Sequence, residues 1–206
     1  SSTDGLTITV THVSSGDADT VTEVETLSFD DGDIGVSHDG NTMVLTGTDS
    51  VTDDIKVVGT VGITVQGAAK ADTITGGDGA DTLMGSDGAD VIDGGEGIDI
   101  IDGSAGIDTL DGGKGADTID GGTGADTIDG GDDADVLTGN IGSDTITGGA
   151  GSDTAVFAGN QSDYTFESST DGLTITVTHV SSGDADTVTE VETLSFDDGD
   201  IGVSHD

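Results

Sequence analysis

The chain of 206 residues contains no cysteine, no proline and no tryptophan, and its only basic side chains besides histidine are three lysines. The absence of cysteine excludes stabilisation by disulfides and suits a protein that relies on metal instead. No apolar run approaches the roughly 20 residues needed to span a membrane, and no signal peptide is visible. Three lysines cannot form the basic surface that nucleic-acid binding requires.

Acidic residues are abundant: 43 aspartates and glutamates give a formal net charge of −40 at pH 7. Such a charge opposes compaction unless cations bind. Because a ligand that binds only the folded state stabilises that state, we expect the chain to be largely disordered without cations and to fold as they bind.

Residues 67–156 are ten consecutive nine-residue units with no insertion between them. Each begins with glycine and carries aspartate at its sixth position; the eighth is Ile or Leu in nine units and Ala155 in the last. The glycine-rich six residues favour a turn, and the remaining three alternate polar, apolar, polar as in a minimal strand. Two units make one coil, and stacked coils enclose a thin aliphatic core between two parallel sheets.

The sixth-position aspartates then form two columns with a spacing of eighteen residues. The columns are Asp72, Asp90, Asp108, Asp126, Asp144 and Asp81, Asp99, Asp117, Asp135, Asp153. Neighbours in a column lie about 4.8 Å apart and repel each other. A hard divalent cation between them removes the repulsion. Calcium suits these oxygen ligands best, since magnesium requires a tighter octahedron and zinc prefers His or Cys, which the units lack.

These units are similar to the nonapeptide Gly-Gly-x-Gly-x-Asp-x-apolar-x of the RTX (repeats-in-toxin) proteins. The resemblance implies an all-β fold, a right-handed parallel β-roll (a calcium-binding β-solenoid) with flanking β-hairpin caps. It also implies that each ion takes the second and fourth carbonyls and the Asp of one unit. The first and third carbonyls and the Asp of the unit eighteen residues on complete the site.

The carbonyl ligands implied by this resemblance belong to Gly77, Gly79, Gly85, Asp87, Gly94, Gly95, Glu96, Gly97, Gly103, Ala105, Gly106, Gly112, Gly113, Lys114, Gly115, Gly121, Gly122, Thr123, Gly124, Gly130, Gly131, Asp132, Gly139, Ile141, Gly148 and Ala150. Ten units paired in this way give about eight Ca²⁺ sites, which would leave a charge of about −24. In the first unit Lys70 occupies a glycine position where positive φ is harder, so the site of Asp72 and Asp90 is expected to be the weakest.

Residues 1–39 and 168–206 are identical, at an offset of 167 residues. We interpret this identity as one repeat of a tandem array plus the start of the next; an engineered duplication is the alternative. The expected organisation is a cap segment at 1–39, metal-free lead-in coils at 40–66, the roll at 67–156 and a C-terminal cap at 157–206.

Alternation of apolar and polar residues predicts a hairpin between 163–167 and 173–179 across Asp171 and Gly172. Residues 187–196 suit either a short helical turn or a strand. The first copy lacks the first strand of this hairpin, which contains Tyr164 and Phe166, so its edge is expected to be open to a preceding module or another chain. The ninth-position acids, such as Asp93 and Asp102, are expected to form outward columns that are solvated or bridged by a cation between two molecules.

No catalytic motif is present, so we expect no enzyme activity. The first hypothesis is a calcium-dependent structural module of a secreted or cell-surface bacterial repeat protein, such as an adhesin stalk, filament or surface layer. It would self-associate with identical neighbouring modules and stiffen in extracellular calcium. The alternative is an accessory or secretion domain of a type I-secreted enzyme, such as a protease, lipase or alginate epimerase. More 167-residue copies would favour the array, and a catalytic motif elsewhere would favour the enzyme.

Overall fold

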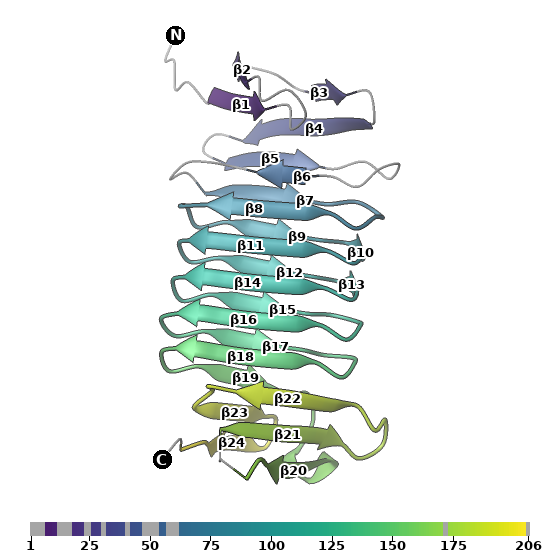
Figure 1. Cartoon of the computed structure of the whole chain (residues 1–206), viewed down its shortest axis with the longest axis vertical. Helices are drawn as coiled ribbons and strands as arrows, with labels where there is room; N and C mark the ends of the chain where they lie inside the picture. The colour runs from purple at the N-terminus through teal and green to yellow at the C-terminus, as the bar shows by residue number, and fades with distance from the viewer. Residues whose placement is uncertain are drawn as a thin grey trace.

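The computed structural model describes residues 62–170 and 173–204, and before them six strands. These are β1 (Thr7–Thr11), β2 (Ala18–Thr22), β3 (Thr26–Phe29), β4 (Gly32–Asp39), β5 (Thr42–Thr46) and β6 (Asp54–Lys56). The strands stack along one axis from the N-terminal to the C-terminal end (Figure 1). The described residues form no α-helix. No helix among them is long and apolar enough to cross a membrane.

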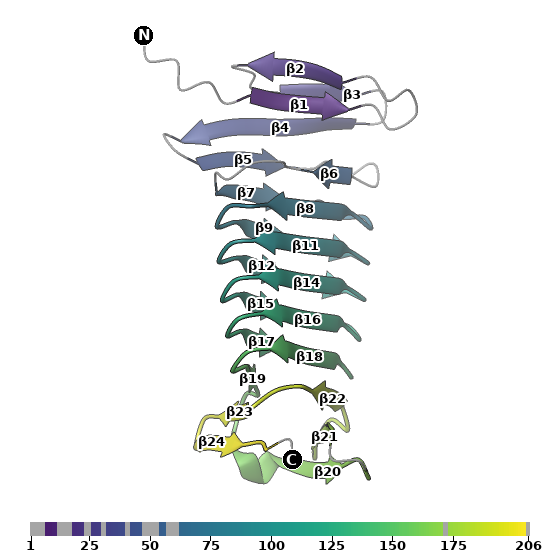
Figure 2. The ribbon, with the colours of Figure 1, turned by 60° about the vertical axis from the view of Figure 1, so that its left-hand side comes forward.

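Two parallel sheets form the roll and face each other along its length (Figure 2). One contains β8 (Thr73–Gly77), β11 (Val91–Glu96), β14 (Thr109–Lys114), β16 (Thr127–Asp132) and β18 (Thr145–Ala150). The other contains β7 (Ile63–Gln66), β9 (Thr82–Met84), β12 (Ile100–Asp102), β15 (Thr118–Asp120), β17 (Val136–Thr138) and β19 (Thr154–Val156). Two short strands in the turns, β10 (Asp87–Gly88) and β13 (Ala105–Gly106), also pair.

The register within each sheet joins residues eighteen apart, as in Ile92 with Leu110 and Ile101 with Ile119. This register confirms the β-roll expected from the nine-residue period. One aliphatic side chain per unit lies between the sheets, and each is at most 1 % exposed: Ile74, Leu83, Ile92, Ile101, Leu110, Ile119, Ile128, Leu137, Ile146 and Ala155. The core is therefore only one side chain deep on each sheet.

At the N-terminal end both sheets continue beyond the nonapeptides. Strand β6 pairs in parallel with β8, and β5 pairs in parallel with β7. Ile55, Ile63 and Val65 extend the aliphatic core in this direction. In the first copy of the duplicated segment β3 and β4 form an antiparallel pair, and β4 also pairs antiparallel with the lead-in strand β5; β1 pairs with β2 in a separate sheet.

The C-terminal cap contains β20 (Tyr164–Ser168), β21 (Thr174–His179), β22 (Ala185–Thr189), β23 (Thr193–Phe196) and β24 (Gly199–Gly202). Strands β20 and β21 form the predicted antiparallel hairpin, whose turn residues Asp171 and Gly172 lie outside the described residues. Residues 187–196, for which the sequence allowed either a short helical turn or a strand, contribute to the strands β22 and β23. They stack in parallel on β18 and β19, and so carry both sheets into the cap.

Aromatic rings cover the end of the aliphatic core. Phe157 stacks on Phe196 with ring centroids 5.4 Å apart, and Tyr164 lies 5.3 Å from Phe196. Phe166 meets Phe196 edge-on at 5.8 Å. This cluster supplies the bulk that a solenoid end needs to shield its core from water.

Candidate metal centre

Each sixth-position aspartate lies at the end of a turn, directly before a strand, and all ten are at most 2 % exposed. The turn bends tightly enough to bury the carboxylate because its glycines adopt left-handed backbone conformations, for example Gly113 with φ 92° and Gly115 with φ 130°. Asp133 and Asn140, which replace glycines, adopt φ of 80° and 66°. Lys70 does not adopt a positive φ, so the strain expected at this residue does not arise.

One oxygen of each carboxylate joins two coils. Oδ1 of Asp99 accepts the backbone N–H of Asp81 at 2.8 Å, and Oδ1 of Asp117 accepts that of Asp99 at 2.8 Å. The same contact recurs along both columns. The columns are therefore regular in structure as well as in sequence.

The second oxygen, Oδ2, is buried without a hydrogen-bond partner in nine of the ten aspartates: Asp81, Asp90, Asp99, Asp108, Asp117, Asp126, Asp135, Asp144 and Asp153. In Asp72, by contrast, Oδ2 accepts the N–H of Ala68 at 2.9 Å. A buried carboxylate oxygen without a partner carries a large desolvation penalty. Nine such oxygens in two columns indicate that something other than protein satisfies them.

Backbone carbonyls converge on these oxygens. A methyl group on Gly76 would lie 2.5 Å from both Oδ2 of Asp81 and the carbonyl oxygen of Gly94 in the next coil. On Gly112 it would lie 2.6 Å from Oδ2 of Asp117 and 2.5 Å from the carbonyl oxygen of Gly130. Glycine at the first position thus keeps open a small space lined by oxygens of two coils.

The other predicted carbonyl ligands divide into two groups. Fourth-position carbonyls, such as that of Gly79, point along the stack at the fourth residue of the next coil. Several second- and third-position carbonyls already accept backbone hydrogen bonds: that of Gly122 from Ile141 at 2.9 Å, and that of Lys114 from Gly97 at 2.7 Å. A carbonyl oxygen has two lone pairs, so these groups retain one for a cation.

Electrostatics favours neutralisation of the columns. Burial, the largest cause, raises the pKa of Asp99, Asp108 and Asp135, a backbone N–H partly offsets it, and nearby carboxylates add to it, so that each pKa lies at about 6. Burial also raises the pKa of Asp81, Asp90, Asp117, Asp126, Asp144 and Asp153. The folded columns therefore attract either protons or cations.

Calcium fits this donor set, since it accepts six to eight hard oxygen ligands in a flexible geometry. In the described part of the chain no three His, Cys, Asp or Glu side chains form a single metal-binding group. Carboxylates therefore come in pairs along a column, and the backbone must supply the remaining ligands. That division suits calcium better than zinc, which prefers nitrogen and sulfur.

The fold and these columns define a calcium-binding β-roll. Four overlapping matches to the family model of the RTX calcium-binding nonapeptide repeat cover residues 59–92, 66–101, 93–128 and 120–155. The roll of this chain belongs to that repeat family, as the nonapeptide pattern predicted, and the family is typical of secreted bacterial proteins. No curated protein matches the chain.

Two acidic residues of the cap join the columns and were not predicted. Asp144 donates its N–H to Oδ1 of Asp186 at 2.9 Å, and Asp153 donates its N–H to Oε2 of Glu192 at 2.8 Å. Burial raises the pKa of Asp186 to about 7. The sequence signal is local: Asp186 and Glu192 each precede a threonine and an aliphatic residue, as the aspartates of the roll precede their strands.

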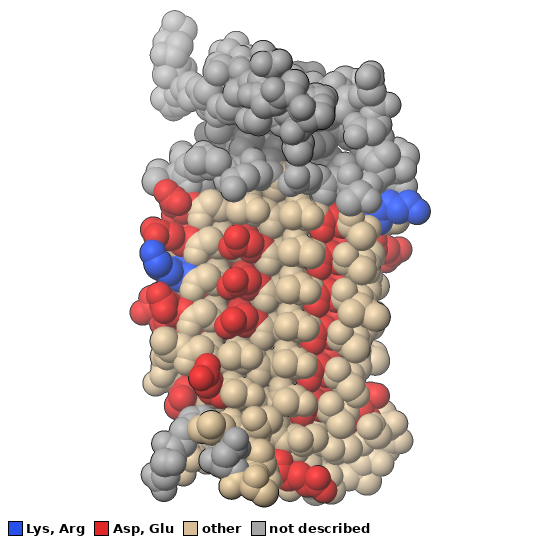
Figure 3. All heavy atoms as spheres, viewed as in Figure 1, with Lys and Arg blue, Asp and Glu red and all other residues tan. Residues whose placement is uncertain are grey.

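The ninth-position acids form a separate, outward set. Asp93, Asp111 and Asp129 are register partners on adjacent strands, and acidic side chains form vertical columns on this face (Figure 3). All three are exposed, whereas Asp102 is half-buried. Solvation of this set, or a cation that bridges two molecules through it, remains a prediction.

Proposed function

We propose that this chain is a calcium-triggered structural module of a secreted or cell-surface bacterial repeat protein, an adhesin stalk, filament or surface layer. In calcium-poor cytosol the acidic chain stays unfolded and can be exported. Outside the cell, calcium binds the aspartate columns, and because it binds only the folded roll, its binding free energy stabilises the fold. The proposal gives the chain no catalytic role.

One observation carries the proposal: the duplicated segment serves opposite ends of the roll. In the second copy, β23 stacks in parallel on β19 and ends the roll. In the first copy, β4 pairs with β5, which pairs in parallel with β7 and begins the roll. The same residues are therefore suited to ending one roll and beginning the next.

The strand pairings support this dual use. In the first copy β4 lies between β3 and β5. In the second copy the corresponding strand, β24, pairs with β23, and no described strand pairs with its other edge. An unpaired edge of this kind accepts another strand. The lead-in strand of a following module, with the sequence of β5, is the partner that we propose.

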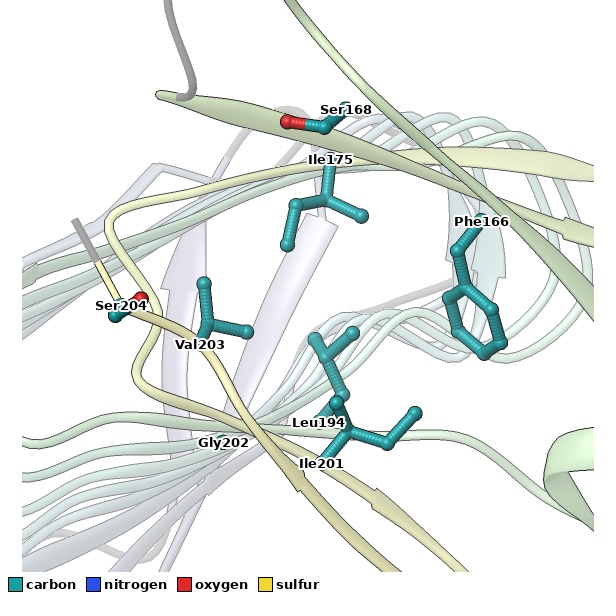
Figure 4. Close-up of a pocket in the computed structure, with 8 residues that line it drawn as sticks. All are labelled: Phe166, Ser168, Ile175, Leu194, Ile201, Gly202, Val203 and Ser204. Atoms are coloured by element: carbon teal, nitrogen blue, oxygen red, sulfur yellow. The ribbon is translucent and has the colours of Figure 1, made fainter. Parts of the chain in front are cut away.

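An apolar cavity of about 380 Å³ lies beside this edge. Its lining includes Phe166, Ile175, Leu194, Ile201 and Val203, whose side chains surround the opening in Figure 4. The sequence of β5, Thr-Met-Val-Leu-Thr, provides aliphatic side chains of the kind that would fill such a space. A stack of modules would then share continuous sheets and act as a stiff rod.

A calcium titration followed by circular dichroism and small-angle scattering tests the proposal. We expect a cooperative gain of β signal, a rod-like particle, and growth in length by end-to-end association at higher protein concentration. Magnesium at the same concentrations is the control and should not induce folding. A compact monomer at every calcium concentration would contradict the proposal.

The accessory-domain alternative also contains a calcium roll, so the titration alone does not separate it from the array. End-to-end growth does, because an accessory domain needs no partner at its exposed edge. A variant that blocks the outer edge of β24, Gly202→Pro, should keep the calcium-induced β signal and lose the growth in length, since proline has no N–H to offer to a following strand and a side chain at this position meets no neighbouring atom.

A further inference from the structure

The turn that joins β22 to β23 is a shortened form of the nonapeptide turn. In the roll six residues separate the end of one three-residue strand motif from the next, whereas here only residues 190–192 do so. Glu190 adopts a left-handed conformation with φ 53°, as glycines do in the roll. The shortened turn retains a carbonyl at its first position and a carboxylate at its last.

The first-position carbonyl lies where the roll places one. A methyl group on Gly148 would lie 2.8 Å from Oδ2 of Asp153 and in contact with the carbonyl oxygen of Glu190. Gly76 shows the same arrangement with Asp81 and the carbonyl of Gly94. Glu190 thus replaces the first glycine of a next coil that the nonapeptides do not supply.

The last-position carboxylate also takes the place of a column aspartate. Oε2 of Glu192 accepts the N–H of Asp153 at 2.8 Å, as Oδ1 of Asp153 accepts that of Asp135 at 2.9 Å. Asp153 is fully buried, and its Oδ2 has no hydrogen-bond partner. Paired carboxylates, a facing carbonyl and an unpartnered buried oxygen are the features that mark the sites inside the roll.

The other column ends in a similar way. Oδ1 of Asp186 accepts the N–H of Asp144 at 2.9 Å, and Oδ2 of Asp144 is buried without a partner. Asp186 is itself 7 % exposed. Both columns therefore run one carboxylate beyond the last nonapeptide, into the cap.

We propose that the cap completes two further calcium sites, one between Asp144 and Asp186 and one between Asp153 and Glu192 with the carbonyl of Glu190. The inference rests on the calcium-binding roll and adds about two ions to those that paired nonapeptides provide. These ions fasten the cap to the last coil. Because Asp19 and Glu25 are the same residues in the first copy, each joint of a tandem array would be fastened by calcium in the same way.

The unmodified chain offers a direct probe of the Asp186 site. Tyr164 is its only tyrosine and there is no tryptophan, and Tyr164 lines the same cavity as Asp186. Terbium, a luminescent substitute for calcium, should therefore emit when tyrosine is excited. We expect this emission in the wild-type chain and its loss, by at least several-fold, in Asp186→Asn. Absence of tyrosine-sensitised emission from the wild-type chain with terbium bound would overturn the Asp186 site.

Ion counting by equilibrium dialysis tests both sites on the full chain. Glu192→Gln and Asp186→Asn should each bind about one ion fewer than the wild type, while the exposed control Glu167→Gln should bind the same number. Tyrosine-sensitised emission should survive in Glu192→Gln more than in Asp186→Asn. Unchanged ion counts in both variants would overturn the proposal. In that case the wild-type chain would still fold when calcium is added. If the proposed function itself were wrong, the wild-type chain would not fold in response to calcium.

Discussion

Replacing Asp108 by asparagine should have opposite effects with and without calcium. Oδ1 of Asp108 accepts the N–H of Asp90 at 2.8 Å, and its own N–H donates to Asp126 at 2.9 Å. Asparagine keeps this acceptor and the side-chain shape. It replaces the unpartnered, charged Oδ2 by a neutral amide group on the side of the carbonyl of Gly121, since both Oδ2 and that carbonyl oxygen lie 2.7 Å from a methyl position on Gly103.

The magnitude follows from the pKa of Asp108, which burial and its column neighbours raise from 3.8 to about 6. A folded-state pKa above the unfolded value means that the folded state binds more protons, so stability falls as pH rises from about 4 to about 6. At pH 7 the ionised carboxylate costs the calcium-free fold about 3 kcal/mol. Asp108→Asn removes that cost. In calcium it removes an anionic ligand shared by two sites and should weaken both.

Circular dichroism at pH 7 measures both effects, as the amount of β signal in chelator without urea and as the urea midpoint of unfolding in saturating calcium. In chelator, Asp108→Asn should shift the equilibrium toward the β form by about 3 kcal/mol or less, and in saturating calcium it should unfold at lower urea. At pH 4 the advantage in chelator should shrink, because the wild-type carboxyl is then protonated. The exposed control Asp78→Asn should change neither condition appreciably. Equal destabilisation in chelator and in calcium would show that the carboxylate is only a structural hydrogen-bond acceptor, and would refute this account of the columns.

The same structure makes three further predictions. In chelator the wild-type β signal should rise as pH falls from about 7 to about 4, because the raised pKa values, such as about 6 for Asp99, favour the protonated fold. Calcium affinity should fall over the same pH range, because protons then compete for the carboxylates. A dichroism signal in chelator that does not change with pH would contradict this reasoning. Gly112→Ala places a methyl group between ligand oxygens and should raise the calcium midpoint of folding, whereas the exposed Thr123→Ala should not, as calorimetric titration can show. Ile119→Ala should lower the unfolding free energy in calcium by about 2–5 kcal/mol through cavity formation, and a cost as small as that of the exposed Thr118→Ala would count against a continuous core.

The roll was predictable because a single local rule recurs ten times. The burial of Ile119 and the column position of Asp117 depend only on residues within one unit and on partners eighteen residues away in the same pattern. Periodicity therefore carries both the local and the tertiary information. The same logic gave the hairpin of β20 and β21, whose alternating residues pair across a short turn.

The cap carboxylates were not predictable by the same rule. Glu192 reaches Asp153 across 39 residues of sequence, and Asp186 reaches Asp144 across 42. Their positions depend on a hairpin folding between the roll and the strands that complete it, and on a turn three residues shorter than the repeat. The engagement of individual carbonyls was equally hidden, because carbonyl direction depends on φ and ψ rather than on residue identity.

The thin core explains why calcium should control the fold as a whole. Each nonapeptide buries one aliphatic side chain and one carboxylate, while its seventh side chain is exposed, or half-buried in the last unit, and its ninth is exposed or half-buried. One side chain per nine residues is a small hydrophobic gain against the entropy of ordering the unit, and the buried charge adds a further cost. A cation between two turns offsets that charge and joins successive coils at once. Since every coil shares ligands with its neighbours, removal of calcium should unfold the roll cooperatively rather than loosen single turns.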